Sequence, residues 1–231
     1  MLRHLIVLCL WVLSFSCVQK QSAETSPPSA SIAEPSDFPL GSQFEELMAD
    51  YVEADRVIWQ KPELVVDLLG ELEGKTVADI GAGYGYFSFR LARRGAKVLA
   101  IEIDTGMLRF IDSIQSFMGE RLKAQIETRV THPDDPGLRE SEADAVLVVN
   151  TYAYLDQRMD YLAKLSAGIK PGGKLLIIDF KKNGVPYISS DTPTVALRRV
   201  VSELEQTGFV IEKADNQTLD YQYIVTAVKP Q

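Results

Sequence analysis

Cysteine is almost absent from this chain of 231 residues, which contains only Cys9 and Cys17, both near its amino terminus. The sequence that follows them offers no disulfide, no thiol nucleophile and no thiolate ligand for zinc or an iron–sulfur cluster. Radical chemistry that depends on such a cluster is therefore excluded. We expect a globular domain without a metal site, stabilised by an apolar core.

Positive charge is also scarce, because 24 lysines and arginines stand against 32 aspartates and glutamates, for a formal net charge of −8. Nucleic-acid binding usually needs a basic face, so this balance argues against a nucleic-acid partner. Adjacent basic residues, such as Lys181 with Lys182 and Arg198 with Arg199, form only pairs. The hydrophobic content of 46% indicates a single domain with a sizeable core.

A short apolar segment, Leu5–Phe15, follows Arg3 and ends just before Cys17. Its length is typical of the central region of a signal peptide and is too short to span a bilayer comfortably. The stretch Leu-Ser-Phe-Ser-Cys that closes it resembles a bacterial lipoprotein signal, in which the cysteine becomes the lipidated first residue. The resemblance implies a signal peptide over residues 1–17 with lipidation at Cys17. A plain secretory signal or an uncleaved anchor is the alternative.

Residues 18–42 are rich in serine, proline, alanine and glutamate and lack apolar periodicity. Such a composition cannot bury enough surface to offset the entropy of ordering, so we expect a disordered tether. With a lipid anchor, the tether would hold residues 43–231 at a membrane. Val18 and Gln19 do not supply the aspartate that retains lipoproteins in the inner membrane. The expected location is therefore the cell envelope of a Gram-negative bacterium, in the outer membrane or periplasm.

The most informative segment is Thr76–Tyr86, with the sequence Thr-Val-Ala-Asp-Ile-Gly-Ala-Gly-Tyr-Gly-Tyr. A strand-like apolar run ends in Asp79, and Gly81, Gly83 and Gly85 then turn the chain into a helix. Residues without a Cβ permit a sharp turn and the close approach of a ligand to the backbone. The pattern predicts a ligand site at the end of a strand in an α/β sheet.

A second acid, Glu102, lies near the end of the next apolar run, Ala96–Ile103, and follows Gly85 by 17 residues (102 − 85). The carboxyl ends of neighbouring parallel strands meet at one edge of a sheet. We therefore expect this carboxylate beside the glycine loop, where it can accept hydrogen bonds from both hydroxyls of a ribose. The two acids and the loop predict a nucleoside-cofactor site on a doubly wound α/β sheet.

The glycine spacing separates the candidate cofactors. A dinucleotide site has the pattern Gly-x-Gly-x-x-Gly, whereas this chain has Gly-x-Gly-x-Gly with bulky Tyr86 at the sixth position. Asp79 would also place negative charge beside a phosphate, which disfavours a nicotinamide oxidoreductase. S-adenosylmethionine carries a sulfonium and an ammonium but no phosphate, so the acid suits it. The segment resembles motif I of the class I S-adenosylmethionine-dependent methyltransferases.

This resemblance implies a fold and a set of cofactor-binding residues. The implied fold is α/β, a Rossmann-like, doubly wound sheet of seven strands in the order 3-2-1-4-5-7-6, with the last strand antiparallel and helices on both faces. Asp134 or its neighbour Asp135 would receive the adenine amino group, and Asn150 would face the reaction region. The residues expected to bind S-adenosylmethionine are Asp79, Gly81, Ala82, Gly83, Tyr84, Gly85, Glu102, Ile103, Asp134 and Asn150.

Two further segments carry the resemblance, which covers about residues 44–229. Arg56–Pro62 reads Arg-Val-Ile-Trp-Gln-Lys-Pro and resembles a segment ahead of motif I in a bacterial group of methyltransferases whose substrates are mostly unassigned. In such enzymes N-terminal helices, expected here within 43–72, cover the cofactor, so Trp59 either lines the pocket or packs on the core. Ile169–Phe180 resembles a methyltransferase signature in which a helix ends at Pro-Gly-Gly and a strand follows.

The sequence thus predicts the transfer of a methyl group from S-adenosylmethionine to an acceptor that it does not identify, whether a small molecule, a lipid or a protein. Transfer from a sulfonium needs a general base only if the acceptor arrives protonated. No catalytic residue is assigned, because His132, next to Pro133 in a loop, is expected at the surface. An inactive binding module with the same fold is the alternative, motivated by the expected envelope location of a protein whose cofactor is made in the cytoplasm.

Overall fold

The computed structural model describes residues 56–182, 185–186 and 188–231. The chain groups by its internal contacts into two units, Met1–Asp37 and Phe38–Gln231, and every described residue belongs to the second. The expected signal peptide, its lipidated cysteine and the tether lie outside the described residues. So does the first part of the expected cap helices. Those expectations stay predictions.

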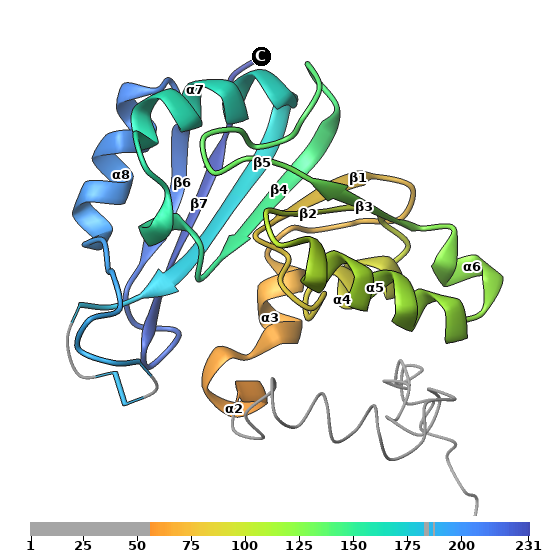
Figure 1. The fold of residues 1–231 in the computed structure, drawn as a ribbon. Helices are drawn as coiled ribbons and strands as arrows, with labels where there is room; N and C mark the ends of the chain where they lie inside the picture. The colour runs from red at the N-terminus through yellow and green to blue at the C-terminus, as the bar shows by residue number, and fades with distance from the viewer. Residues whose placement is uncertain (1–55, 183–184, 187) are drawn as a thin grey trace, which may run out of the picture. The chain divides into compact units, whose positions relative to one another are not determined.

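The described residues contain one mixed sheet, whose strands are β1 (Thr76–Ile80), β2 (Lys97–Glu102), β3 (Ile126–Val130), β4 (Ala143–Val149), β5 (Ile169–Phe180), β6 (Val210–Asp215) and β7 (Gln222–Val228). The seven strands lie in the order β3-β2-β1-β4-β5-β7-β6 (Figure 1), which confirms the order expected from the sequence. β7 is antiparallel to both β5 and β6, and the other neighbouring pairs are parallel. The direction of winding reverses between β1 and β4, where open α/β sheets bind their ligands.

The described helical segments are α2 (Arg56–Gln60), α3 (Pro62–Asp67), α4 (Ser88–Arg93), α5 (Thr105–Phe117), α6 (Glu120–Lys123), the 3₁₀ turn η2 (Tyr152–Tyr154), α7 (Arg158–Gly168) and α8 (Leu197–Gln206). Figure 1 shows α3, α4 and α5 on one face of the sheet and α7 and α8 on the other. The expected arrangement of helices on both faces is therefore confirmed.

Two apolar layers hold the strands between these helices. Because successive side chains of a strand point to opposite faces, Val77 of β1 packs with α3, α4 and α5, and Ala78 packs with α7 and α8. In β4, Leu147 and Val146 divide in the same way, and both are fully buried. Strands covered on both faces read as continuous apolar runs. Their packing fixes the carboxyl ends of β1, β2 and β4 relative to one another.

The start of α8 differs from the sequence pattern. Thr192–Pro193 is typical of a helix start, with an N-cap residue and a first-turn proline, yet α8 begins at Leu197 behind Ala196. The backbone N–H of Thr192 donates to the Ser189 carbonyl at 3.1 Å, so this segment forms a turn. The helix starts instead where its apolar stripe begins, because only that stripe can pack against the sheet.

The Pro-Gly-Gly segment also differs from its expected place. α7 ends at Gly168, before the segment, and β5 already begins at Ile169. Ile169 pairs with Ala143 of β4, and the next pairing joins Lys174 to Ala145, so the residues between them form an irregularity in the ladder. Proline and glycine suit such an interruption, because neither favours a regular central strand.

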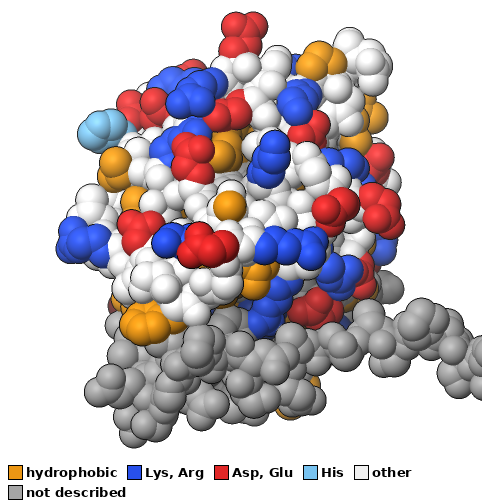
Figure 2. Space-filling view, turned by 90° about the vertical axis from the view of Figure 1, so that its right-hand side faces the viewer, with side chains coloured by type: hydrophobic (Ala, Val, Ile, Leu, Met, Phe, Trp, Pro, Cys, Tyr) orange, Lys and Arg blue, Asp and Glu red, His pale blue; other side chains and the backbone are white. Residues whose placement is uncertain are grey.

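The surface of the described part carries mixed charge. In the face shown in Figure 2, acidic and basic side chains are interspersed. This face therefore has no field of one sign that would attract a highly charged polymer. Among the described helices, none has both the length and the apolar character needed to cross a bilayer.

Candidate functional site

A cavity of about 550 Å³ lies at the carboxyl ends of β1, β2 and β4, at the switch point of the sheet. Its volume is in the range of small-molecule sites, and its position is the one that open α/β sheets use for ligands. Most of the residues expected from the sequence line it: Asp79, Gly81, Ala82, Gly83, Tyr84, Glu102, Ile103 and Asn150. Their roles in binding stay predictions, but the fold brings them to one place.

The loop after β1 is shaped by its glycines. Gly81 has φ +70°, and a Cβ on it would overlap the side chain of Thr151. Gly83 has φ +56°, and a Cβ on it would meet nothing within 4 Å, because it would project into open space. Gly85 does not line the cavity; a Cβ there would come within 2.8 Å of the Phe89 ring. Gly83 is therefore the position at which a ligand can approach the backbone most closely.

Asp79, the next-to-last residue of β1, has a buried carboxylate and is 3% exposed. Ser88 on α4 donates its hydroxyl hydrogen to this carboxylate at 2.7 Å. Burial raises the pKa of Asp79 from 3.8 to about 6, and the nearby charge of Glu102 adds to the rise. The Ser88 hydrogen bond and the charge of Arg56 act in the opposite direction. A cationic ligand beside Asp79 would offset the cost of ionising this buried carboxyl group.

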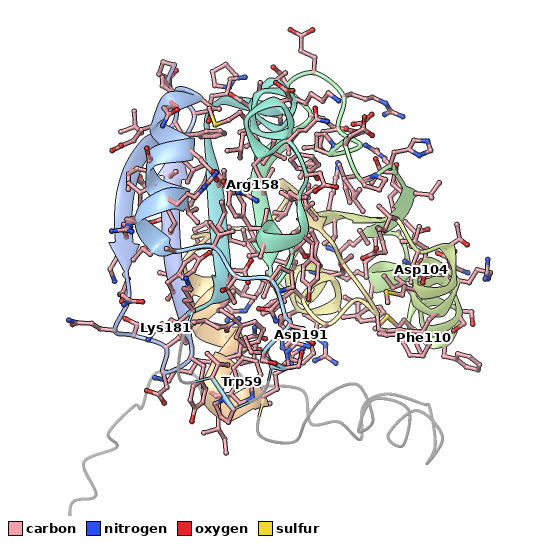
Figure 3. The ribbon with its side chains drawn as sticks, turned by 60° about the vertical axis from the view of Figure 1, so that its left-hand side comes forward. Trp59, Asp104, Phe110, Arg158, Lys181 and Asp191 are labelled. Carbon is pink, nitrogen blue, oxygen red and sulfur yellow. The ribbon has the colours of Figure 1, made fainter. Side chains whose placement is uncertain are left out.

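Glu102 ends β2 and is held by the backbone around it. One carboxylate oxygen accepts the N–H of Gly83 at 3.0 Å. The other accepts the N–H groups of Ile103 at 2.7 Å and of Asp104 at 3.2 Å. Asp104 in turn caps α5 (Figure 3), with its side chain accepting the N–H of Gly106 at 2.6 Å. A carboxylate fixed in this way still has lone pairs for hydroxyl groups on the cavity side.

Asn150 follows β4 in the left-handed region, with φ +54°. Non-glycine residues rarely adopt this conformation, and when they do they cluster at functional sites. Its side-chain oxygen accepts a hydrogen bond from the amide of Gln222 on β7. Gln222 in turn accepts one from the amide of Gln60 at 3.1 Å, and Gln60 accepts one from Nε of Arg56 at 2.6 Å. Both glutamines are completely buried.

This chain of contacts brings Arg56 to the wall of the cavity. The Arg56 guanidinium carbon lies 4.0 Å from the centroid of the Tyr86 ring, and that of Arg90 lies 3.9 Å from the same centroid. Such cation–ring contacts help to hold a guanidinium in place. Neither Arg56 nor Gln60 was predicted as a site residue, and their only signal in the sequence was the resemblance of Arg56–Pro62 to a methyltransferase segment.

Asp134 does not line the cavity, although the sequence suggested it as the partner of adenine. It is exposed, and Lys164 donates to its backbone carbonyl at 2.7 Å. The residues of this loop that do line the cavity are Thr131, His132 and Pro133, which directly follow β3. His132 is exposed as expected and borders the cavity as well. An adenine contact by Asp134 therefore stays a prediction without support from this geometry.

Trp59 packs on the core and does not line the cavity. Of the two alternatives that the sequence left open for this residue, the structure therefore shows the core position. Its ring centroid lies 5.8 Å from that of Phe180, the last residue of β5. Figure 3 shows Trp59 and Lys181 at the same end of the sheet. The contact anchors α2 against the sheet and so places Arg56 and Gln60 at the switch point.

The strand order, the acids at the ends of β1 and β2 and the glycine loop between them define the class I methyltransferase fold. A solved structure described as a SAM dependent methyltransferase from Aquifex aeolicus shares this fold with a TM-score of 0.70. The likeness covers 80% of this chain and 97% of that chain at 22% identity, so it concerns the fold alone.

Residues 78–177 match the family described as methyltransferase domain. A tRNA U34 carboxymethyltransferase of Hydrogenovibrio crunogenus is 34% identical over 113 residues, which are 47% of this chain and 33% of that protein. A demethylmenaquinone methyltransferase of Renibacterium salmoninarum is 29% identical over 122 residues, 53% of this chain and 47% of that protein. The chain thus spans about a third to a half of the length of these relatives, and their names give different substrates.

The hydrogen-bond acceptors of the cavity fit S-adenosylmethionine, and the match to a methyltransferase domain supports the same cofactor. A buried carboxylate, Asp79, suits a ligand with cationic groups. A second carboxylate, Glu102, suits a ribose, and the open space at Gly83 lies beside it. Neither acid would favour the pyrophosphate of a dinucleotide.

Proposed function

We propose that this protein transfers a methyl group from S-adenosylmethionine to an acceptor. One observation carries the proposal: the open space in front of Gly83 lies in a cavity that also holds the carboxylates of Asp79 and Glu102. A nucleoside that carries positive charge fits this cavity, because it can lie against the backbone at Gly83 and close to the two carboxylates. The structural likeness and the matched domain support methyl transfer but leave its acceptor undefined.

The strand order gives the cavity two ends. Glu102 is the last residue of β2, and Thr131 to Pro133 follow β3, so the adenosyl end of the ligand would lie there. The carboxylate of Glu102 would accept the ribose hydroxyls, and the half-exposed side chain of Ile103 would border the base. Asp79 near the end of β1 and Asn150 directly after β4 mark the other end, where the methionyl group would lie.

The chain contributes mainly by orienting its ligands. S-adenosylmethionine supplies an already activated methyl group. For an in-line displacement, the acceptor atom has to lie on the side of the methyl carbon opposite the sulfur. Holding two reactants in this geometry can lower a barrier by about 7–11 kcal/mol. Thr151, Tyr154 and Leu155 line the cavity just after β4, and an acceptor would enter beside them. His132 belongs to the β3 end, so we assign it no role as a general base.

The acceptor is proposed to be a small molecule, a lipid or a protein. The net charge of −8 and the mixed charges of the face in Figure 2 favour these classes over nucleic acid. One relative is named for a tRNA, so the exclusion of nucleic acid stays a prediction. No feature of the cavity favours the alternative of a binding module without transfer.

Calorimetric titration with S-adenosylhomocysteine tests the assignment of the loop. We expect a dissociation constant of ~1–100 μM, and we expect Gly83→Val to abolish binding because a side chain would occupy the space of the adenosine. Gly74→Val is the matched control: Gly74 also has positive φ, at +73°, and a Cβ on it would likewise meet nothing within 4 Å, but it lies outside the cavity. Equal affinity in the two variants would refute the assignment.

A further inference from the structure

The methionyl end of S-adenosylmethionine carries two opposite charges, an ammonium and a carboxylate. Asp79 matches the ammonium, but a carboxylate also needs a donor, and a cation is the strongest one. Among the described residues that line the cavity, Arg56 is the only lysine or arginine. Its charge acts on the Asp79 carboxyl, so the guanidinium lies near the β1 end of the cavity.

Contacts of its side chain and the anchoring of its helix both help to position Arg56. Its Nε donates to the side-chain oxygen of Gln60 at 2.6 Å. Its guanidinium lies over the Tyr86 ring, 4.0 Å from the centroid. The helix that carries it is anchored by Trp59 on Phe180. An arginine held by neighbours loses little conformational entropy when it binds an anion, and the bond is correspondingly stronger.

Gln60 links Arg56 to Asn150, another residue that lines the cavity. Its side-chain oxygen accepts from Arg56 and its amide nitrogen donates to Gln222, whose own amide donates to Asn150. The hydrogen bonds of the Gln60 side chain with Arg56 and Gln222 are partly buried and buried, respectively, and Gln60 itself is completely buried. Hydrogen-bond chains in such surroundings specify one arrangement of their members. Gln222 therefore orients the Gln60 side chain so that its oxygen faces Arg56.

We propose that Arg56 binds the carboxylate of the methionyl group and that Gln60 is a positioning residue that holds Arg56 for this contact. The inference rests on the proposed function, because it names a contact of the same ligand. Arg56 thus completes the site opposite Asp79: the acid receives the ammonium and the arginine receives the carboxylate. An arginine that served an anionic acceptor instead would leave cofactor binding unchanged.

Two ligands that share the nucleoside test this contact. S-adenosylhomocysteine has the amino-acid group, and 5′-methylthioadenosine lacks it. We expect Arg56→Met to weaken S-adenosylhomocysteine at least tenfold, the range for a hydrogen bond to a charged group, and to change 5′-methylthioadenosine less than twofold, by calorimetry. Arg56→Lys should restore part of the loss, because it keeps the charge but not the fork of donors.

Arg90→Met is the matched control, since Arg90 lies over the same Tyr86 ring at 3.9 Å but does not line the cavity. It should leave the affinity for both ligands within twofold. Equal weakening of both ligands by Arg56→Met, or no weakening of either, would overturn the inference. Failure of the unmodified chain to bind S-adenosylhomocysteine would instead refute the proposed function itself.

Gln60→Leu separates positioning from direct contact. It should weaken S-adenosylhomocysteine about three- to tenfold and leave 5′-methylthioadenosine unchanged, because Gln60 acts only through Arg56. In the Arg56→Met background the same substitution should add no further loss of affinity for S-adenosylhomocysteine. Additive losses in the double variant, or equal loss for the two ligands, would show that Gln60 acts on the fold and not through Arg56.

Discussion

Replacing Asp79 by asparagine should stabilise the fold and weaken the site at the same time. The carboxyl is 3% exposed, and burial raises its pKa from 3.8 to about 6. A rise of this size corresponds to about 3 kcal/mol between the protonation states. Asparagine has nearly the same shape, carries no charge, and can still accept the hydrogen bond from Ser88. We expect Asp79→Asn to raise the free energy of unfolding by about 1–3 kcal/mol at pH 8.

The pH dependence of this gain has a defined sign. Because the folded-state pKa of Asp79 is raised, the folded protein binds the proton more readily than the unfolded chain between about pH 4 and pH 6. The stability that this carboxyl contributes is greatest below that window, falls as the pH rises through it, and stays low above it. The difference between Asp79→Asn and the unmodified chain should therefore be full at pH 8 and nearly vanish at pH 4.

Urea denaturation at pH 8, 6 and 4 measures the stability, and calorimetry at pH 8 measures the affinity for S-adenosylmethionine. We expect the affinity to fall at least tenfold in Asp79→Asn, since a charge-assisted contact is lost. A variant that is less stable than the unmodified chain at every pH, or that binds the cofactor with unchanged affinity, would refute the reasoning. The first result would mean that the carboxylate is needed for folding, and the second that it does not face the ligand.

Three further predictions concern protons, an ion pair and the amino terminus. At pH 6, cofactor binding should release protons from Asp79, so the apparent enthalpy should change with the ionisation enthalpy of the buffer; no change would contradict the raised pKa. Glu142→Gln should cost about 1–3 kcal/mol in urea denaturation, because it breaks a two-pronged pair with Arg129 at 2.8 and 2.9 Å. Glu127→Gln, which alters an exposed partner of the same arginine, should cost less than about 1 kcal/mol, and the reverse order would refute this. In a Gram-negative host, the unmodified chain should incorporate labelled palmitate and Cys17→Ser should not; equal labelling would exclude lipidation at that residue.

The sheet and the core of the site were predictable because their signals are local. A strand that ends in an acid, a glycine turn and a helix can be recognised in Thr76–Tyr86 alone. Glu102 needed one more step, the rule that neighbouring parallel strands end at the same edge, and the structure places it beside Gly83 at 3.0 Å. The strand order followed from the resemblance and is confirmed.

The contacts of Arg56 were not predictable in the same way. Gln60 and Gln222 are 162 residues apart, and nothing in the sequence around either indicates that they meet. Their contact arises because Trp59 anchors α2 on the end of β5, next to β7 in the sheet. Such long-range contacts depend on packing between elements, which the pattern of one segment does not contain.

In the loop after β3 and at the start of α8, the type of residue did not predict where the backbone would place it. The resemblance implied Asp134 or Asp135 as the partner of adenine, but Thr131 to Pro133 are the residues of this loop that line the cavity. Thr192–Pro193 had the chemistry of a helix start, yet the helix formed only where its apolar stripe could be buried. In both cases the path of the backbone determines where these residues lie, and residue type alone does not predict that path.

The most direct test is a crystal structure of the chain with S-adenosylhomocysteine bound. The account predicts the ribose hydroxyls at about 2.6–3.2 Å from the Glu102 carboxylate, with the amino-acid group between Asp79 and Arg56. The nucleoside should pass over Gly83. A ligand bound away from the ends of β1 and β2, or a cavity that stays empty at saturating ligand, would contradict it.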